Sequence, residues 1–314
     1  MQALSKVNLD HVLRHEKSPT AVAVGASCLS WLILGQLNRW YSRRTVNNAT
    51  SDTTWDWDKE IVLLTGGSSG IGAAIADELA KRAVKVIIVD VHAPAKSRLR
   101  ANQHFYQLDV TSSLNIAEVA AQIRKEHGDP TVLINNAGIG NAKPLLEVTE
   151  DRLRAVFEVN IIAHFLLLQE FLPAMVTTNH GHIVALASMA SFSTQASNVD
   201  YAATKAGVLV LHEGLGQELK FLYNAPRVRT TVVHPSWIRT PMVQRLIDTG
   251  KMKSGWTEAE DVAKAITKQL YSGYGGQVII PDSLWWTSAI RGFPSWLQEK
   301  LRDAVSKQLL AANS

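Results

Sequence analysis

A glycine-rich turn stands between an expected strand and an expected helix early in the chain. Glu60 to Thr65 is a short apolar run without polar alternation, which predicts a parallel strand buried on both faces. The segment 66–72, GGSSGIG, follows at once, and a helical pattern runs from Ala73 to Arg82. Glycine lets the backbone approach a pyrophosphate closely, and a helix N-terminus offers free N–H groups to phosphates. This order predicts a dinucleotide site.

The second expected strand, Lys85 to Val89, ends in an acidic residue. Asp90 stands eighteen residues after Gly72, at the spacing where a carboxylate binds both ribose hydroxyls of an adenosine. Its charge would repel a 2′-phosphate, and no Arg or Lys follows it immediately. We therefore predict NAD as the cofactor in preference to NADP. A helix N-cap is the alternative role for Asp90.

Strands and helices alternate through the rest of the central region. Further strands are expected at residues 104–108, 131–134, 182–187, 229–233 and 277–280, with helical stretches between them. We predict an α/β fold, a Rossmann-type doubly wound parallel sheet in a single catalytic domain at residues 59–281. The 314 residues leave room for one such domain with flanking segments.

The N-terminal fifth has a different character. After a tail at residues 1–17, the 21 residues of 18–38 carry no formal charge and are mostly apolar. As a helix they span roughly 30 Å, about the thickness of a bilayer core. We predict a transmembrane or membrane-anchor helix there, followed by a linker at residues 39–58. A buried core helix is the alternative, which the lack of an amphipathic stripe disfavours.

Basic residues beside this segment bear on its orientation. Three precede it and three follow it, so the two flanks tie. The following group, Arg39, Arg43 and Arg44, lies closer to the segment, which favours a cytosolic catalytic domain. Asn48-Ala49-Thr50 is a glycosylation sequon, and its use would instead place that domain in the lumen.

Composition excludes several kinds of site. The one cysteine, Cys28, allows neither an intramolecular disulfide nor a cysteine-based zinc site, and we predict no metal. The net charge of +4 is spread along the chain without a long basic run. We therefore expect no nucleic-acid partner.

Two residues on one helical face are suited to acid–base chemistry. Tyr201 and Lys205 stand four apart at the start of a helical pattern. A neighbouring ammonium, joined by the positive nicotinamide, favours the phenolate, so we expect Lys205 and the cofactor together to lower the pKa of Tyr201. Ser188, at the end of the fifth expected strand, could hydrogen-bond the reacting oxygen, and Asn160 could anchor a water that relays protons from Lys205. Taken alone, the Tyr-x-x-x-Lys spacing is common on helix surfaces.

These positions together resemble the short-chain dehydrogenase/reductase family over residues 60 to about 281. The matching motifs are Thr65-Gly66-x-x-x-Gly70-x-Gly72, Asp109, Asn135-Asn136-Ala137-Gly138, Asn160, Ser188, Tyr201-x-x-x-Lys205 and Pro235 to Thr240. The resemblance implies Tyr201 as acid/base, Ser188 as the residue that orients the substrate, and Lys205 with Asn160 as a proton relay. It implies a cofactor site made of Gly66, Ser68, Ser69, Gly70, Ile71, Gly72, Asp90, Asp109, Val110, Asn136, Ala137, Gly138, Tyr201, Lys205, Pro235, Ile238 and Thr240.

A narrower likeness points to the membrane-bound retinol and 17β-hydroxysteroid dehydrogenase branch. It rests on segments 157–165 and 179–184, on the apolar N-terminal segment, and on Val278 to Pro281 with the apolar residues that follow. The likeness implies a lipophilic alcohol as substrate and attachment to the endoplasmic reticulum or lipid droplets. A homodimer is a further expectation.

Three departures from the family pattern have consequences. Ser236 replaces the usual glycine after Pro235, which is expected to alter the nicotinamide loop slightly. Only eighteen residues separate Asp90 from Asp109, so we expect the helix between their strands to be cut short. The segment 236–255 carries no recognisable specificity signature.

The C-terminal tail, residues 282–314, combines aromatic and apolar residues with basic neighbours. One interpretation is a helix lying in a membrane interface. Packing over the substrate cleft or at a dimer interface is an equal alternative.

Three functions are compatible with these features. The first is an NAD(P)-dependent oxidoreductase that interconverts a lipophilic alcohol, of retinoid, steroid or fatty-alcohol type, and its carbonyl. The second is a carbonyl reductase in a polyketide or terpenoid biosynthetic pathway. The third is a non-catalytic membrane or lipid-droplet protein that retains the fold, which the complete Asn160, Ser188, Tyr201 and Lys205 set disfavours.

Overall fold

The computed structural model describes residues 19–95, 99–248 and 255–313. The chain divides after Ala49 into two compact units, and the second unit is Thr50–Ser314. The tail expected at residues 1–17 lies outside the described residues, as does part of the segment 236–255.

In the part of the first unit that the structure describes, residues 19–46 form one long helix, α2 (Pro19–Val46). Its large apolar side chains are exposed on all sides, with Trp31 at 78% and Leu34 at 62% exposure. The helix runs eight residues past the expected anchor and so includes the first residues of the expected linker. Two arginines in the last turn complement the negative end of the helix, and Asn47 Nδ2 donates to the Arg43 carbonyl at 2.8 Å.

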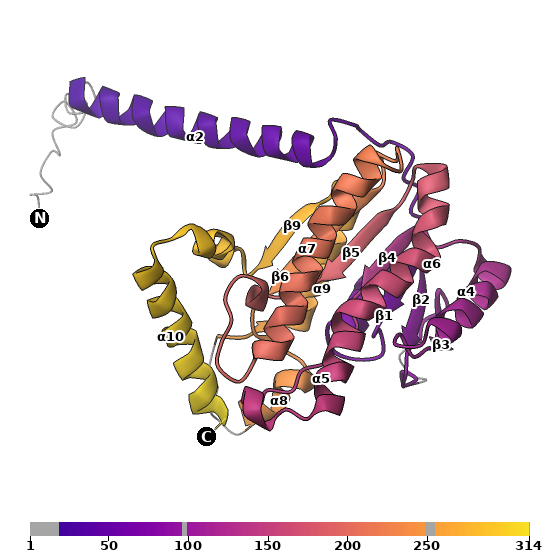
Figure 1. Cartoon of the computed structure of the whole chain (residues 1–314). Coiled ribbons are helices and arrows are strands. Elements are labelled where there is room, and N and C mark those ends of the chain that lie inside the picture. Colours follow the sequence, from indigo (N-terminus) through magenta and orange to yellow (C-terminus); the bar gives the residue numbers. More distant parts are fainter. Residues whose placement is uncertain (1–18, 96–98, 249–254, 314) are drawn as a thin grey trace, which may run out of the picture. The chain divides into compact units, whose positions relative to one another are not determined.

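The second unit is built on a seven-stranded parallel sheet in the order β3-β2-β1-β4-β5-β6-β9 (Figure 1). The strands are β1 (Ile61–Thr65), β2 (Lys85–Asp90), β3 (Gln103–Gln107), β4 (Val132–Asn135), β5 (His182–Leu186), β6 (Arg229–Pro235) and β9 (Gly276–Ile280). The order reverses direction at β1 and β4, which confirms the predicted doubly wound fold. Each expected strand is present within one or two residues of its expected bounds.

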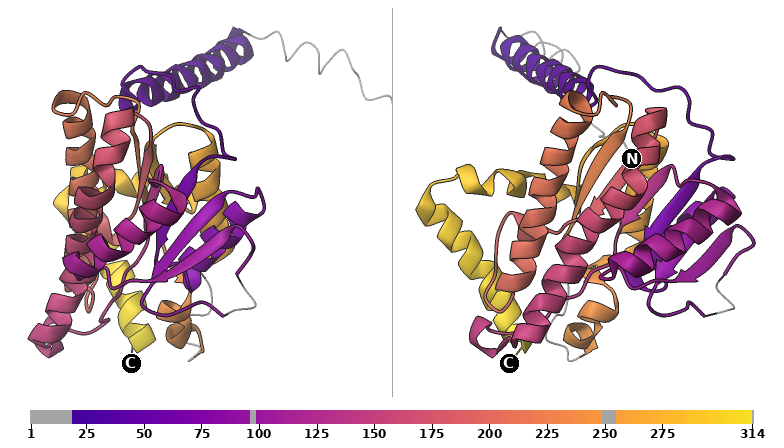
Figure 2. Two further views of the ribbon diagram at one scale, coloured as in Figure 1. Left: turned by 90° about the vertical axis from the view of Figure 1, so that its right-hand side faces the viewer. Right: turned by 45° about the vertical axis from the view of Figure 1, so that its right-hand side comes forward.

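Helices cover both faces of this sheet (Figures 1 and 2). One face carries α3 (Gly70–Ala80) and α9 (Ala259–Tyr271), and the other carries α4 (Ser113–His127), α6 (Ala163–Thr178) and α7 (Val199–Phe221). The side chains of successive residues in β1 point to opposite faces of the sheet. Leu63 packs with α4 and α6 on one face, and Leu64 packs with α3 and α9 on the other.

Shorter elements follow the carboxyl ends of β4, β5, β6 and β9. Before α6 come the 3₁₀ turn η2 (Leu145–Glu147), α5 (Glu150–Phe157) and a π-helical turn, η3 (Glu158–Ile162). The 3₁₀ turn η4 (Met189–Ser191) follows β5, and β7 (Ile238–Arg239), α8 (Pro241–Asp248) and β8 (Thr257–Glu258) follow β6. The tail forms a 3₁₀ helix, η5 (Asp282–Gly292), and α10 (Ser295–Asn313).

The link between β2 and β3 is short, as expected. No helix forms in the described parts of residues 91–102, which are 91–95 and 99–102. This confirms the prediction that the usual helix between these strands is cut short.

Among the described residues, the helical stretch Glu150–Thr178 is the one long and apolar enough to cross a membrane by length and composition. It is 44% buried, and Leu167 and Phe171 of α6 lie in the core against the sheet. This stretch is therefore a core helix, and membrane attachment through α2 stays a prediction.

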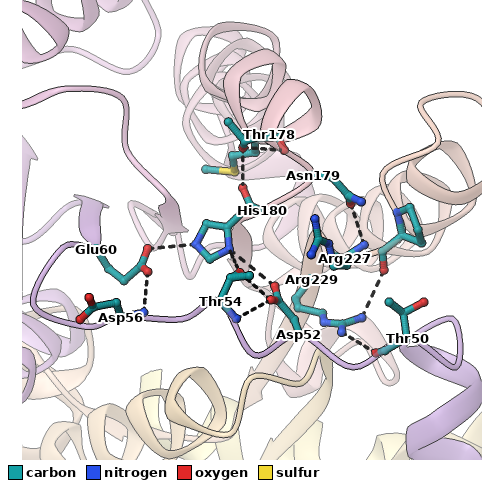
Figure 3. A network of polar contacts seen from close by, with 12 residues as sticks. Thr50, Asp52, Thr54, Asp56, Glu60, Thr178, Asn179, His180, Arg227 and Arg229 are labelled. Atoms are coloured by element: carbon teal, nitrogen blue, oxygen red, sulfur yellow. Dashed lines mark hydrogen bonds and ion pairs between the residues drawn. The ribbon is translucent and has the colours of Figure 1, made fainter.

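The segment 50–60, here called the strap, lies along the amino edge of the sheet and meets His180, just before β5. The His180 Nε2 atom lies 3.2 Å from Glu60 Oε2, and Nδ1 lies 3.0 Å from Thr54 Oγ1 and 3.5 Å from Asp52 Oδ2 (Figure 3). The imidazole thus bridges two carboxylates of the strap. Sequence reasoning treated residues 50–58 as part of a linker and gave no signal of this network.

Aromatic packing and an arginine hold the same segment. The Trp55 ring lies 4.4 Å from the His180 ring, and Trp57 stacks on Trp55 at 5.4 Å. Arg229, at the start of β6, donates to the Thr50 carbonyl at 2.7 Å. The strap therefore fixes the point at which the chain enters the second unit.

We expect the stability of the strap to fall as the pH rises above neutrality. The hydrogen bond to the Glu60 carboxylate raises the pKa of His180, against the effect of burial. A raised folded-state pKa gives stability that is complete below the unfolded value of about 6.5 and is lost as the pH passes the folded value. His180→Gln should lower the free energy of unfolding by about 1 to 2 kcal/mol at pH 6 and less at pH 9.

Thermal unfolding at both pH values measures this, with His92→Gln as a control that leaves the strap intact. An equal effect of His180→Gln at pH 6 and pH 9 would contradict the ionic contribution.

The carboxylates of the strap change its stability in the opposite direction, because their contribution is lost when the pH falls. Although burial opposes it, hydrogen bonding from His180 lowers the pKa of Glu60, so its contribution is lost as the pH falls through the folded value.

Candidate active site

The glycine-rich turn forms at the carboxyl end of β1, where the parallel strands also place the ends of β2, β4, β5 and β6. Gly66 and Gly70 have φ of +64° and +53°, in the left-handed region. A Cβ at Gly72 would lie 2.1 Å from the Gly66 carbonyl oxygen, so only glycine fits there. Ser69 is the N-cap of α3 but makes no side-chain cap. The first N–H groups of α3 are thus left available to an anion.

Thr65 and Asn136 tie this turn to the end of β4. The Thr65 hydroxyl oxygen accepts the N–H groups of Asn136 and Ala137, each at 3.0 Å. The Asn136 Nδ2 atom donates to the carbonyls of Thr65 at 2.9 Å and Gly66 at 3.1 Å. Asn136 therefore acts in this structure as a brace of the turn. Sequence reasoning placed Asn136 in the cofactor site but missed the bracing role of the Thr65 hydroxyl.

The two expected adenosine-side acids end β2 and follow β3. Asp90 accepts the N–H of Ser68 at 3.1 Å through Oδ2 and that of His92 at 3.1 Å through Oδ1. It therefore lies against the glycine-rich turn, as the ribose-binding prediction requires. Asp109 accepts both the N–H and the hydroxyl of Thr111, and Val110 is buried beside it.

The loop after β6 reaches the same place from the other side. Ser236 N donates to the Ile280 carbonyl at 2.8 Å, so the serine that replaces the usual glycine fits between β6 and β9. A Cβ at Gly70 would lie 3.3 Å from Thr240 Cγ2, which puts Thr240 against the start of α3. Ile238 is buried in β7 between Pro235 and Thr240.

Tyr201, Lys205 and Ser188 meet at the carboxyl end of β5. Tyr201 and Lys205 lie one turn apart on α7, with Lys205 Nζ 5.6 Å from the centre of the Tyr201 ring. Ser188 is the N-cap of η4, where its Oγ accepts the Ala190 N–H at 3.1 Å, and hydrogen bonding with its side chain acts to lower the pKa of Tyr201. The structure thus brings together three of the four predicted catalytic residues.

The expectation that Lys205 and the positive nicotinamide together lower the pKa of Tyr201 concerns the cofactor-bound enzyme and stays a prediction. Burial raises the pKa of Tyr201, and the hydrogen bond with Ser188 lowers it only in part. Lys205 is itself buried, which lowers its pKa to about 8, and its Nζ donates to the Leu186 carbonyl at 2.7 Å. Its ammonium therefore points at the end of β5 and not at the phenol oxygen.

Asn160 lies in the π-helical turn and holds the loop after β4. Its Oδ1 accepts the Ile139 N–H at 2.9 Å, and its Nδ2 donates to the Ile139 carbonyl at 2.9 Å and to Thr204 Oγ1 at 3.2 Å. A Cβ at Gly138 would lie 3.5 Å from both Asn160 Oδ1 and Lys205 Nζ. Gly138 therefore stands between the two residues of the predicted relay. The sequence predicted a helix here but not its π-helical turn, a geometry that often marks functional sites.

His234 is a member of this site that sequence reasoning missed. The residue is fully buried near the end of β6, with Nδ1 3.0 Å from the Ser188 carbonyl and its ring 4.4 Å from Phe192. Burial lowers the pKa of His234 to about 4, so the imidazole is neutral at pH 7. Because a carbonyl only accepts, Nδ1–H is the donor. His234 thus supports Ser188 from within the fold.

The residues present fit a nicotinamide dinucleotide. The uncapped start of α3 is suited to the pyrophosphate, Asp90 to the adenosine ribose, and the 235–240 loop to the nicotinamide end. These groups follow one another along the carboxyl edge toward Tyr201.

Comparison with known proteins agrees with this geometry. Residues 60–251 match the family of short chain dehydrogenases. The chain belongs to the short-chain dehydrogenase/reductase family. Dehydrogenase RED2 of Cochliobolus heterostrophus is 46% identical over 215 residues, which cover 68% of this chain and 78% of that protein. Estradiol 17-beta-dehydrogenase 11 of Mus musculus is 34% identical over 192 residues, 59% of this chain and 64% of that protein.

Solved structures show the same fold. A short-chain dehydrogenase/reductase from Burkholderia phymatum in complex with NAD superimposes with a TM-score of 0.67 at 23% identity, covering 76% of this chain and 95% of that one. A metagenomic short-chain oxidoreductase in complex with NADP gives a TM-score of 0.57 at 27% identity over 71% of this chain and 97% of that one. The chain is thus an oxidoreductase whose fold relatives hold nicotinamide cofactors of both kinds.

Proposed function

We propose that this enzyme is an NAD-dependent oxidoreductase that interconverts a lipophilic alcohol and its carbonyl. The observation that carries the proposal is the convergence of Tyr201, Ser188 and Lys205 at the carboxyl end of β5, beside a dinucleotide turn. The cofactor, when bound, supplies the hydride chemistry. The chain itself has to orient the substrate oxygen and move one proton.

Tyr201 exchanges that proton with the substrate oxygen. During oxidation its oxygen accepts the alcohol proton, and during reduction its hydroxyl donates a proton to the carbonyl oxygen. Ser188 orients the same substrate oxygen. Lys205, whose pKa burial lowers to about 8, can lose and regain a proton near neutrality. A Cβ added at Gly138 would lie 3.5 Å from both Lys205 Nζ and Asn160 Oδ1, so both side chains reach the same glycine, and we assign both to the proton relay.

Asp90 supports NAD over NADP in this proposal. Its two carboxylate oxygens are fixed by the N–H groups of Ser68 and His92, so the charge stays at the ribose position. A 2′-phosphate placed there would meet a like charge at close range.

Exposed apolar side chains support a lipophilic substrate and a membrane location. Leu146, which follows β4 in η2, is 98% exposed, and Met242 of α8 is also exposed close to the nicotinamide loop. The apolar, exposed helix α2 is suited to a bilayer at the endoplasmic reticulum or on lipid droplets, with the catalytic unit in the cytosol. Phe157, at the end of α5, and Phe165, in the first turn of α6, are exposed, which is compatible with a homodimer.

One assay tests substrate class, cofactor and location together. The full chain is expressed, membranes are separated, and estradiol, retinol and hexadecanol are offered with NAD or NADP. We expect the membrane fraction to oxidise at least one of these alcohols with NAD as the cofactor. Activity on polar sugars or short alcohols alone, or activity only with NADP, would contradict the proposal.

The second candidate is reduction of a carbonyl in a biosynthetic pathway. The observation that favours it is the higher identity to Dehydrogenase RED2, at 46%, than to the mouse estradiol dehydrogenase, at 34%. The same Tyr201 and Ser188 serve both directions, so the assay includes the matching carbonyls with reduced cofactor. The alternative of a non-catalytic protein is not supported, because the chain belongs to an enzyme family and its sequence holds Asn160, Ser188, Tyr201 and Lys205.

A further inference from the structure

The C-terminal tail returns to the turn that carries Ser188. After β9, η5 and α10 lead away from the sheet and come back beside the loop before α7 (Figure 2). Arg291 Nη2 donates to the Ser191 carbonyl at 3.0 Å, and its Nε reaches the Phe192 carbonyl at 3.5 Å. On α10, Ser306 Oγ accepts the Ala196 N–H at 3.0 Å. The tail thus contacts the turn that carries Ser188 and the loop before α7, while its place at a membrane interface stays a prediction.

We propose that Arg291 is a positioning residue for the reaction, whose guanidinium caps the Ser188 turn, residues 188–192, and fixes the Ser188 hydroxyl against Tyr201. This inference rests on the proposed function of Tyr201 and Ser188. It gives the tail a role in turnover in addition to any contact with a membrane.

The other supports of the Ser188 turn come from inside the fold. His234 donates to the Ser188 carbonyl, and Ser191 Oγ donates to the Lys205 carbonyl at 2.8 Å. These bonds hold the start of the turn and one side chain near its end. The carbonyls of Ser191 and Phe192 lie at the C-terminal end of the short 3₁₀ helix. Because the helix stops there, no following helical turn offers them a backbone N–H donor. The guanidinium of Arg291 supplies N–H donors to these two carbonyls.

An arginine is suited to this position for a geometric reason. Its planar fork directs two N–H groups to two neighbouring oxygens, which a single ammonium cannot do with the same geometry. No carboxylate pairs with Arg291 within the part of the chain that the structure describes, so its donors are committed to the turn. A basic side chain beside the last carbonyls of a helix is also favoured electrostatically.

Displacement of the turn has a specific consequence at Tyr201. The hydrogen bond from Ser188 is the contact that lowers the pKa of Tyr201 against the effect of burial. If the turn relaxes, this bond lengthens, and the pKa of Tyr201 rises. The cofactor contacts at α3 and Asp90 lie on other elements, so cofactor binding is expected to stay unchanged.

The test compares Arg291→Met, Arg291→Lys and Arg302→Met in the full chain. Arg302 is the matched control, because it donates to Glu299 and Gln298 within α10 and does not touch the Ser188 turn. With the best alcohol of the panel and NAD, we expect Arg291→Met to lower kcat about 10-fold to 100-fold. The dissociation constant for NADH should stay within about twofold, and the pH of half-maximal oxidation should rise. Arg291→Lys should be intermediate, and guanidinium ion should partly restore Arg291→Met.

Hydrogen exchange of the amides in residues 189–193 gives a readout that does not depend on activity. It should speed up in Arg291→Met and stay unchanged in Arg302→Met. Unchanged kcat and pH profile, or equal losses in both variants, would overturn the proposal. A failure of the proposed function is distinguishable, since Tyr201→Phe would then keep activity whatever Arg291 does.

Discussion

Replacing Tyr201 with Phe should lower turnover by about 10² to 10⁴-fold while NADH still binds within about twofold of its wild-type affinity. The substitution removes one oxygen, which is the atom that Ser188 hydrogen-bonds and that would exchange a proton with the substrate. The ring remains, so its packing against the 138–140 loop is kept, where Gly140 lies beside the Tyr201 ring. Initial rates and a fluorescence titration with NADH measure the two quantities separately.

Tyr223→Phe is the matched control, because the Tyr223 hydroxyl lies on the exposed end of the α7 region and donates to Glu218 at 2.8 Å. It should leave turnover unchanged. Activity of Tyr201→Phe near that of the control would sink the assignment of Tyr201. Loss of NADH binding together with turnover would instead point to a structural defect.

The elements that the sequence predicted well are those governed by local patterns. Buried parallel strands are continuous apolar runs, and the glycine-rich turn has few residue types that its backbone angles allow. Asp90 and the 235–240 loop could be placed because each follows such a strand. Their convergence then follows from the parallel order of the sheet.

Features that depend on tertiary contacts could not be predicted in this way. The direction of the Lys205 ammonium depends on the Leu186 carbonyl, which no spacing rule connects to it. The strap network joins residues more than a hundred positions apart, such as Glu60 and His180. Arg291 is one of the basic residues of the aromatic tail, and no sequence pattern connects it to the Ser191 and Phe192 carbonyls that it contacts.

The second large effect is expected from Gly72→Ala. The added Cβ would lie 2.1 Å from the Gly66 carbonyl oxygen and 2.7 Å from Asn136 Nδ2. Neither neighbour can yield easily, because Asn136 holds the carbonyls of both Thr65 and Gly66. We expect a loss of about 3 kcal/mol in the free energy of unfolding and a fall of more than about tenfold in NADH affinity. Urea unfolding and NADH titration measure the two effects.

Gly214→Ala supplies the control, since a Cβ there meets nothing within 4 Å and Gly214 lies inside α7. It should stabilise the protein by about 0.5 to 1 kcal/mol and leave NADH binding unchanged. If Gly72→Ala behaved like Gly214→Ala, the close packing of α3 on the turn would be wrong. If it lost stability but kept NADH affinity, the turn would not be where the cofactor phosphates bind. The pair of glycines therefore separates a structural need for glycine from a role of the same turn in binding.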